Sequence, residues 1–201
     1  YAIAEVGWIT PEKDYADFHR RALVLNDRLK AEGYNVFDLA NEYGQRRESL
    51  TPVEHLAKGA KVTYVTPYHQ KYRAGGDSTL TDGLRGGWTY GDRRWQGWLG
   101  DAEMVVDLGE VKPVHYLDAA FMHSEGAWVH LPETVTWSVS PDGTNFTEAG
   151  TVWCDVDATY PKIMFKSYGL PVDADARYIK LSAKGNPRPG AWLFLDEIVV
   201  Q

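Results

Sequence analysis

The change in hydrophobic period near Lys61 constrains the fold of this chain most strongly. From there to the C-terminus, short runs of alternating apolar and polar residues are separated by clusters of Gly, Pro, Asp and Asn. Such alternation predicts strands with one buried face, and Asp142-Gly143 predicts a tight hairpin. The runs lie at residues 62–65, 104–108, 114–117, 135–139, 178–181 and 194–200. Because no helical pattern separates them, we expect a mainly β chain, folded as an antiparallel β-sandwich or jelly roll.

The N-terminal region has a helical period instead. Apolar residues three and four positions apart predict one amphipathic helix over residues 10–33. They are Tyr15, Phe18, Ala22, Leu25 and Leu29. Thr10-Pro11 or Asp14 can cap its start, and Gly33 suits the left-handed position after its end. A single helix cannot bury its own apolar stripe. We expect the stripe to pack on the following domain, on a domain absent from this sequence or on a second copy of the chain.

Residues 34–59 read as a connector with weak local signals. Thr51-Pro52-Val53-Glu54 has the form of a capping box, which leaves a short helix over residues 52–57 open.

Composition narrows the classes of function. The net charge of −7 argues against a nucleic-acid surface, which needs a basic stripe. The single cysteine, Cys154, excludes an intrachain disulfide and a thiolate zinc site. No apolar run approaches the roughly 20 residues of a membrane helix. His69, His115, His123 and His130 are not spaced as a metal cluster, and we expect them at the surface or in turns.

Aromatic residues are abundant, with 8 Trp and 12 Tyr. We expect most of the tryptophans to fill the core, and the surplus to supply flat platforms on which sugar rings can stack.

Several segments match one family pattern in order. They are the stretch 56–63, Leu80-Thr81-Asp82-Gly83, Trp95-Gln96-Gly97, the stretch 105–109, Ser138-Val139-Ser140-Pro141-Asp142-Gly143 with Phe146, the stretch 176–181, and Asp196-Glu197-Ile198. Together they resemble the discoidin, or coagulation factor 5/8 type C, family, many of whose bacterial members are carbohydrate-binding modules. The resemblance implies a galactose-binding-domain-like jelly roll. The spacing departs from the family between Asp82 and Trp95, where residues 86–92 look like an inserted loop.

Further details are similar to the C-terminal domain of bacterial β-N-acetylhexosaminidases of glycoside hydrolase family 20. They are Tyr72-Arg73-Ala74-Gly75-Gly76, Arg94-Trp95-Gln96-Gly97, Phe121-Met122 and the stretch 192–197. The stretch 4–8, the helix and Gly33-Tyr34-Asn35 resemble the end of the family's (β/α)8 barrel. The resemblance implies a remnant of that barrel at 1–33, a connector at 34–59 and a discoidin-like sandwich at 60–201. It also implies a periplasmic or extracellular parent enzyme.

We do not expect chemistry in this region. The family's hydrolysis is assisted by the substrate's acetamido group and needs an adjacent Asp-Glu pair at the end of a central barrel strand. The one such pair, Asp196-Glu197, lies in the predicted closing strand, where neighbouring side chains point to opposite faces. No other catalytic motif is present. The sequence therefore predicts an accessory region that is inactive alone.

The resemblance implies a structural calcium site. Its ligands would be the Leu80 carbonyl and the carboxylates of Asp82 and Glu197, hard oxygens that suit Ca²⁺. In the alternative, Asp82 forms only an Asx turn and Glu197 pairs with a basic residue.

A sugar site is expected on loops at one end of the sandwich. The candidates are Tyr90, Arg93, Arg94, His123, Trp128, Asn186, Arg188 and Trp192. The partners would be glycans with terminal galactose or N-acetylhexosamine. In the alternative, Trp128 and Trp192 pack in the core and the region braces the missing catalytic barrel without glycan affinity. A binding module should expose aromatic and polar side chains on one rim, whereas a brace should expose an apolar patch.

Overall fold

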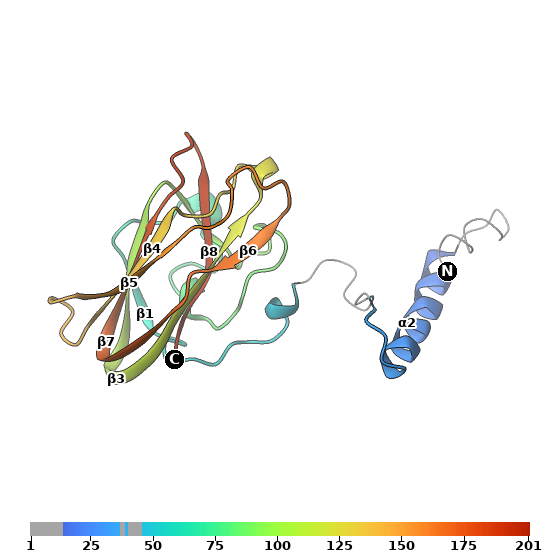
Figure 1. Ribbon diagram of the computed structural model, residues 1–201, viewed down its shortest axis with the longest axis horizontal. Coiled ribbons are helices and arrows are strands. Elements are labelled where there is room, and N and C mark those ends of the chain that lie inside the picture. Colours follow the sequence, from blue (N-terminus) through green and yellow to red (C-terminus); the bar gives the residue numbers. More distant parts are fainter. Residues whose placement is uncertain (1–13, 37–38, 40–45) are drawn as a thin grey trace. The chain divides into compact units, whose positions relative to one another are not determined.

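The computed structural model describes residues 14–36, 39 and 46–201. The chain divides into two compact units, Tyr1–Gln45 and Arg46–Gln201 (Figure 1). The predicted barrel-like stretch 4–8 lies outside the described residues.

The first unit contains helix α2, Tyr15–Ala31. Asp14 caps its start by accepting a hydrogen bond from the Asp17 amide, so the predicted cap at Asp14 is confirmed, while Thr10-Pro11 lies outside the described residues. At its end the Tyr34 amide donates to the Leu29 carbonyl and the Gly33 amide to the Lys30 carbonyl, both at 3.0 Å. Gly33 has φ +84°, as this left-handed cap requires.

The second unit is an antiparallel β-sandwich, and the predicted fold class is confirmed. Its strands are β1 (Lys61–Tyr64), β2 (Gln96–Leu99), β3 (Ala102–His123), β4 (Thr134–Ser140), β5 (Thr147–Trp153), β6 (Met164–Ser167), β7 (Leu170–Lys184) and β8 (Trp192–Val200). Short 3-10 helices lie at Arg47–Ser49, Gln70–Tyr72, Thr79–Thr81 and Glu125–Ala127. The order is β2-β8-β3-β7-β4-β5, with β1 and β6 also paired to β3.

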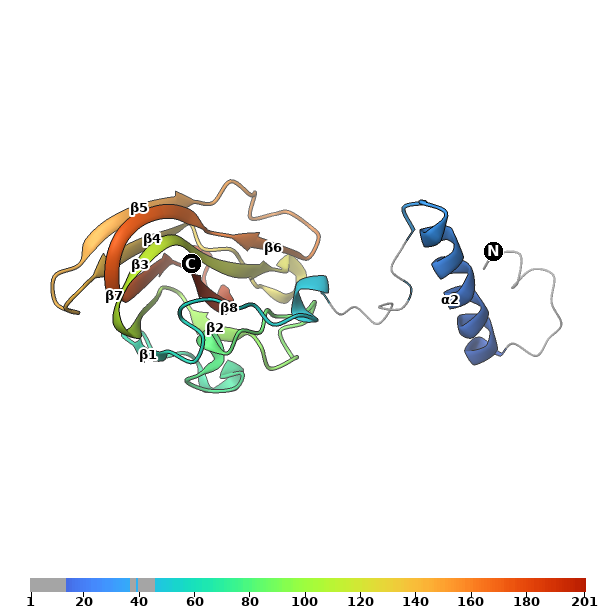
Figure 2. The same cartoon turned by 90° about the horizontal axis from the view of Figure 1, so that it is seen from below.

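Strand β3 connects the two layers. Its first half pairs with β1 and with the second half of β7, whereas its last residues pair with β8 and β6. The β3–β7 register shifts between Asp107 and Lys112, and such irregularities let a strand bend. Both long strands curve strongly in Figures 1 and 2. Both predicted runs, 104–108 and 114–117, are confirmed as strand, but they belong to this one bent strand and not to two separate strands.

The predicted hairpin at Asp142-Gly143 is confirmed. It joins β4 to β5, and Gly143 has φ +76°. The Asp142 carboxylate accepts hydrogen bonds from the Thr144 and Asn145 amides, both at 2.8 Å. These bonds lower the pKa of Asp142 well below its usual value.

The segment 52–57 is not helical. The Val53 amide donates to the Gly83 carbonyl and the Leu56 amide to the Val200 carbonyl, both at 2.8 Å. These amide donors are bonded to the sandwich, so residues 52–57 do not form the short helix that the sequence left open. The segment packs against the sandwich instead.

The main core fills the space between the layers, with Leu117, Trp137 and Ile179 fully buried in it. A smaller apolar cluster of Trp95, Met122, Val129 and Phe194 lies apart from it.

Candidate functional site

The smaller cluster supports a group of aromatic side chains at the surface. Tyr72, Tyr90 and Trp192 are half-buried and pack against it. Tyr90 stacks on Phe194 with ring centres 5.2 Å apart. Tyr72 meets Trp192 edge-on at 4.7 Å and Tyr90 edge-on at 5.7 Å. These contacts fix the rings against one another.

Gly97 makes this packing possible. A Cβ at residue 97 would lie 2.9 Å from both the Phe194 ring and the Tyr72 Cβ. Any other residue there would displace the aromatic group, so a glycine inside β2 has a packing reason.

Tyr90 and Arg93 share a surface cleft. It has a volume of about 380 Å³ and is also lined by Tyr72 and Arg73. Arg93 is exposed and has a left-handed backbone, with φ +67°. The cleft therefore combines phenol rings with guanidinium groups.

The loops 123–130 and 185–192 form the adjoining surface. The Trp192 amide donates to the Trp128 carbonyl and the His130 amide to the Trp192 carbonyl, both at 2.9 Å. The Trp128 indole donates to the Pro189 carbonyl at 3.0 Å, and the Arg188 guanidinium lies 5.7 Å from the Trp128 ring centre. Trp128 remains 44% exposed. Asn186 accepts a hydrogen bond from the Arg188 amide at 3.1 Å.

We call these four loops, 69–73, 86–95, 123–130 and 185–192, the rim. Of the predicted sugar-site residues, Tyr90 and Arg93 lie in its cleft, and Trp128, Asn186 and Arg188 lie on its other part. Trp192 joins the two parts through Tyr72. No sequence pattern predicts a binding role for Tyr72 or for His69, whose ring lies 5.1 Å from that of Trp192. The resemblance of residues 72–76 to the hexosaminidase domain is the one signal that includes Tyr72.

Two of the predicted residues turn inward. Arg94 donates through Nη1 to the carbonyls of Ser49 and Arg85. His123 is 1% exposed, and its Nε2 lies 2.7 Å from the Tyr160 carbonyl. Both side chains therefore support the rim from below.

His123 and His130 are both buried, so the expectation of surface histidines is wrong for this pair. It holds for His69 and His115, which are exposed. Burial and the nearby charge of Arg188 lower the pKa of His130. The rings of His123 and His130 lie 5.6 Å apart. A protonated imidazole would find little solvent at this position.

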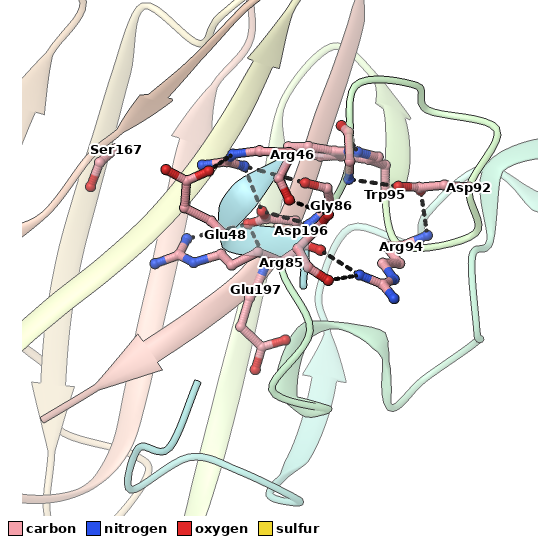
Figure 3. A network of polar contacts seen from close by, with 12 residues as sticks. Arg46, Glu48, Arg85, Gly86, Asp92, Arg94, Trp95, Ser167, Asp196 and Glu197 are labelled. Atoms are coloured by element: carbon pink, nitrogen blue, oxygen red, sulfur yellow. Dashed lines mark hydrogen bonds and ion pairs between the residues drawn. The ribbon is translucent and has the colours of Figure 1, made fainter. Parts of the chain in front are cut away.

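A buried ionic network lies beneath the loop 86–95 (Figure 3). Asp196 is fully buried and accepts from the Gly86 amide at 3.0 Å. Its carboxylate lies 3.4 Å from Nη1 of both Arg46 and Arg85. Arg85 also pairs with Asp118 at 2.6 Å, and Asp118 accepts from the Ser167 hydroxyl. Burial raises the pKa of Asp196 to about 6, even though the charges of Arg85 and Arg46 lower it.

The network fastens the segment before the sandwich to the rim. The Arg46 guanidinium lies 4.2 Å from the centre of the Phe165 ring, and Ser49 is 9% exposed. Within the loop, Asp92 accepts from the amides of Gly87 and Arg94, and the Trp95 indole donates to the Gly87 carbonyl (Figure 3). The loop is therefore held along its length.

Two of the three predicted calcium ligands, Asp82 and Glu197, lie close together on the opposite side of β8. Glu197 points away from Asp196 (Figure 3), and its Oε1 accepts from the Gly83 amide at 3.0 Å. The His55 Nε2 lies 2.9 Å from the same oxygen. Asp82 accepts from the Leu84 amide at 2.8 Å, which forms the Asx turn of the alternative interpretation. Both features of that alternative are therefore present.

One observation remains in favour of a cation. The Oε2 of Glu197 is buried and has no hydrogen-bond partner. Burial raises the pKa of Glu197 to about 7, and the Asp82 charge adds to this shift. Burial also raises the pKa of Asp82. Two carboxylates in one partly buried place are costly unless a cation compensates them or a proton shared between Glu197 and Asp82 neutralises one of them.

Residues 14–36, 39 and 46–201 contain no group of three or more His, Cys, Asp or Glu side chains able to hold a metal. A calcium site here would combine two carboxylates with main-chain carbonyls. In the same described part of the chain, no helix has the length and apolar character needed to cross a membrane.

Comparisons with known proteins identify structures with a similar fold. No family model matches the chain, and no curated protein sequence matches it significantly. Solved structures do match. One is the fifth CBM32 module of a GH89 protein from Clostridium perfringens, in complex with GalNAc-β-1,3-galactose. It has a TM-score of 0.52 and 18% identity, over 73% of this chain and 99% of that one.

A second match is a chitosan-binding module of a chitosanase/glucanase from Paenibacillus sp. IK-5. It has a TM-score of 0.49 and 17% identity, over 74% of this chain and 98% of that one. The match at TM-score 0.52 shows that the chain shares the β-sandwich fold of the CBM32 module. At these identities the likeness extends to the fold alone.

Proposed function

We propose that the second unit binds carbohydrate at the rim. The observation that carries the proposal is the half-exposed Trp128, whose ring is held by the Pro189 carbonyl beside Arg188 and Asn186. A flat ring supplies the apolar face on which a pyranose stacks, and the guanidinium and amide supply donors for its hydroxyls. The adjoining cleft of Tyr72, Tyr90 and Arg93 extends the same chemistry.

The fold supports this proposal, but the residues of the rim carry it, because one fold hosts many functions. The matched modules include one in complex with an N-acetylgalactosamine-containing disaccharide. Terminal galactose and N-acetylhexosamine are therefore the ligands to try first.

The test is an NMR titration of the full chain with galactose, N-acetylgalactosamine and N-acetylglucosamine. A shallow site binds monosaccharides near the millimolar end of the scale, at about −4 kcal/mol. We expect chemical-shift changes in the rim loops. If none of the three sugars moves a rim resonance at tens of millimolar, the proposal is wrong.

The same proposal includes a biological setting. The motif resemblance supports an accessory role in a β-N-acetylhexosaminidase-like glycoside hydrolase, in the periplasm or outside the cell. Within such a protein the rim would hold glycan near the catalytic barrel, and the predicted chain division at 1–33, 34–59 and 60–201 follows from the same resemblance.

A structural brace is the second candidate, and the Arg46 contacts favour it. Arg46 and Ser49 attach the segment before the sandwich to the rim through buried contacts. A barrel connected through this segment would be held at a defined point. The two functions are compatible, and sugar titration distinguishes binding from bracing alone.

We also propose a calcium ion between the Asp82 loop and β8. The unpartnered Glu197 Oε2, the Asp82 carboxylate and the Leu80 carbonyl would hold it. When bound, the ion would compensate the two carboxylates and fix the loop to the closing strand. Its role would be structural.

A further inference from the structure

Trp153 is the most exposed tryptophan of the described residues, and the rim does not include it. Its side chain is 71% exposed at the end of β5. Strand β5 lies at the end of the sheet order, so no neighbouring strand covers its outer side. An indole left this open has apolar area available for a ligand.

The strand register places polar side chains beside this ring. Trp153 is paired with Thr134 of β4, and Thr134 is paired with Lys184 of β7. Residues paired across antiparallel strands point to the same face, and neighbouring strands lie about 4.8 Å apart. The Lys184 ammonium lies 2.9 Å from the Asp101 carboxylate. An indole, a hydroxyl, an ammonium and a carboxylate therefore form one row across the sheet.

A groove follows this row. It has a volume of about 480 Å³. Its lining combines the polar residues Thr134, Lys184, Glu133 and Asn186 with Trp153 and the apolar side chains of Leu131, Pro132, Cys154 and Val156. Ligand pockets fall in the range of roughly 300–1,000 Å³. The groove could therefore hold a sugar ring.

The next row on the same face is polar as well. The hydroxyls of Thr136 and Thr151 lie 2.7 Å apart, and Ser182 donates to Glu103 at 2.8 Å. Beside Trp153 the sheet face therefore carries hydroxyls and charges, while the groove adds a small apolar lining. A pyranose ring has an apolar face and polar edges, and it matches this combination. The surroundings favour a small polyhydroxylated ligand over a protein segment.

We propose that this groove is a second carbohydrate subsite, with Trp153 as the platform for a pyranose ring. The inference rests on the proposed carbohydrate-binding function. Asn186 lines the groove and also belongs to the 185–192 loop of the rim, so the two subsites flank one loop. Thr134, Glu133 and Lys184 would meet the sugar hydroxyls.

The test is a titration of the full chain, labelled for backbone amide and indole NMR signals, with the same three monosaccharides. We expect the Trp153 indole and the amides of Thr134 and Lys184 to shift, and to saturate independently of Trp128. Trp153→Ala should weaken the response of Thr134 and Lys184 at least about tenfold and leave the rim affinity unchanged. Trp153→Phe, which retains an aromatic face, should restore part of it. Tyr116→Ala, which removes an exposed aromatic residue outside the rim and the groove, is the control and should not alter the Thr134 and Lys184 response.

The outcomes separate the two proposals. Shifts at Trp128 without any at Trp153, Thr134 or Lys184 would overturn the second subsite and leave the proposed function standing. No shift at either place would overturn both. A lower molecular mass of Trp153→Ala in sedimentation, with no change in sugar response, would show that Trp153 serves a contact between copies of the chain and would contradict the proposal.

Discussion

The tryptophans differ in environment more than the sequence suggested. Trp95, Trp98 and Trp137 are buried, whereas Trp88, Trp128 and Trp153 are 45%, 44% and 71% exposed. Trp192 is half-buried, and Trp8 lies outside the described residues. The expectation that most tryptophans fill the core is therefore wrong for the described ones. An alternating pattern shows which strand face is apolar, but loop tryptophans such as Trp128 have no period from which burial can be predicted.

His130 gives a pH-dependent prediction at the residue scale. Burial, Arg188 and His123 lower its pKa, and only Glu125 and a contact with the Ala158 backbone act in the other direction. His130 therefore takes up its proton at a lower pH in the folded chain than in the unfolded chain, where the imidazole pKa is about 6.5. Stability from the neutral imidazole is present above pH 6.5 and is lost as the pH falls below it.

Urea unfolding at pH 7.5 and 5.5 checks this, with His130→Gln as the comparison. Asp196 and Glu197 titrate in both proteins, so their contributions cancel in the difference. The loss of stability on acidification should be smaller in His130→Gln than in the native chain. An equal loss in both proteins would contradict the role of His130.

At the scale of elements, the regular strands were easier to predict than their connections. The runs at 135–139, 178–181 and 194–200 lie in β4, β7 and β8, and the run at 62–65 overlaps β1 except for Val65, because alternation records one buried face. Strands β2, β5 and β6 gave no such signal. Strand β5 is an edge strand with only partial burial, and β2 and β6 have four residues each. The bend in β3 depends on its pairing with β7, and the residues of β3 alone do not reveal that long-range pairing.

The attachment of the segment before the sandwich depends on Arg46. Removing one partner of a buried ion pair typically costs about 3–5 kcal/mol. Since Arg85 also pairs with Asp196, we expect Arg46→Ala to lower the free energy of unfolding by about 3 kcal/mol. Denaturant unfolding with constant slope measures this. Arg93→Ala, which removes an exposed arginine, should change stability by no more than about 0.5 kcal/mol. If both substitutions change the free energy of unfolding equally, the buried Arg46–Asp196 pair does not stabilise the fold more than an exposed arginine does.

Calcium, if it joins the Asp82 loop to β8, should stabilise the sandwich by mass action. At a concentration 100 times the dissociation constant the gain is about 2.7 kcal/mol. The melting temperature should rise with calcium and fall with chelator, and Asp82→Ala should abolish both changes. Asp92→Ala, in the neighbouring loop, is the control and should keep the calcium response. A melting temperature indifferent to calcium and chelator would rule out the site.

At the scale of the whole molecule, the β-sandwich and its loop-end grouping of aromatic and basic residues could be predicted from sequence. The buried support could not. Arg46 and Asp196 are 150 positions apart, and His55 and Glu197 are 142 apart. Such pairs follow from the closed topology, which brings the segment before β1 beside the last strand. Arg94 and His123 differ from the prediction of surface side chains, because the residue type alone does not show whether a loop side chain points inward or outward.

The two proposed subsites differ in construction. The rim rests on its own aromatic cluster, whereas the Trp153 groove rests on the strand register of the sheet. A sugar chain longer than one residue could contact both across the 185–192 loop. Carbohydrate binding at the rim does not depend on the second subsite.

The dissociation constant of N-acetylgalactosamine, measured by NMR for the native chain and for Trp128→Ala, tests that claim most directly. Tyr116→Ala is the matched control, because Tyr116 is a 37% exposed aromatic residue on β3, about 20 Å along the strand from His123. We expect the native chain to bind near the millimolar range, with the affinity lost or weakened at least about tenfold in Trp128→Ala and unchanged in Tyr116→Ala. Equal affinities for all three proteins, or no binding by the native chain, would contradict it.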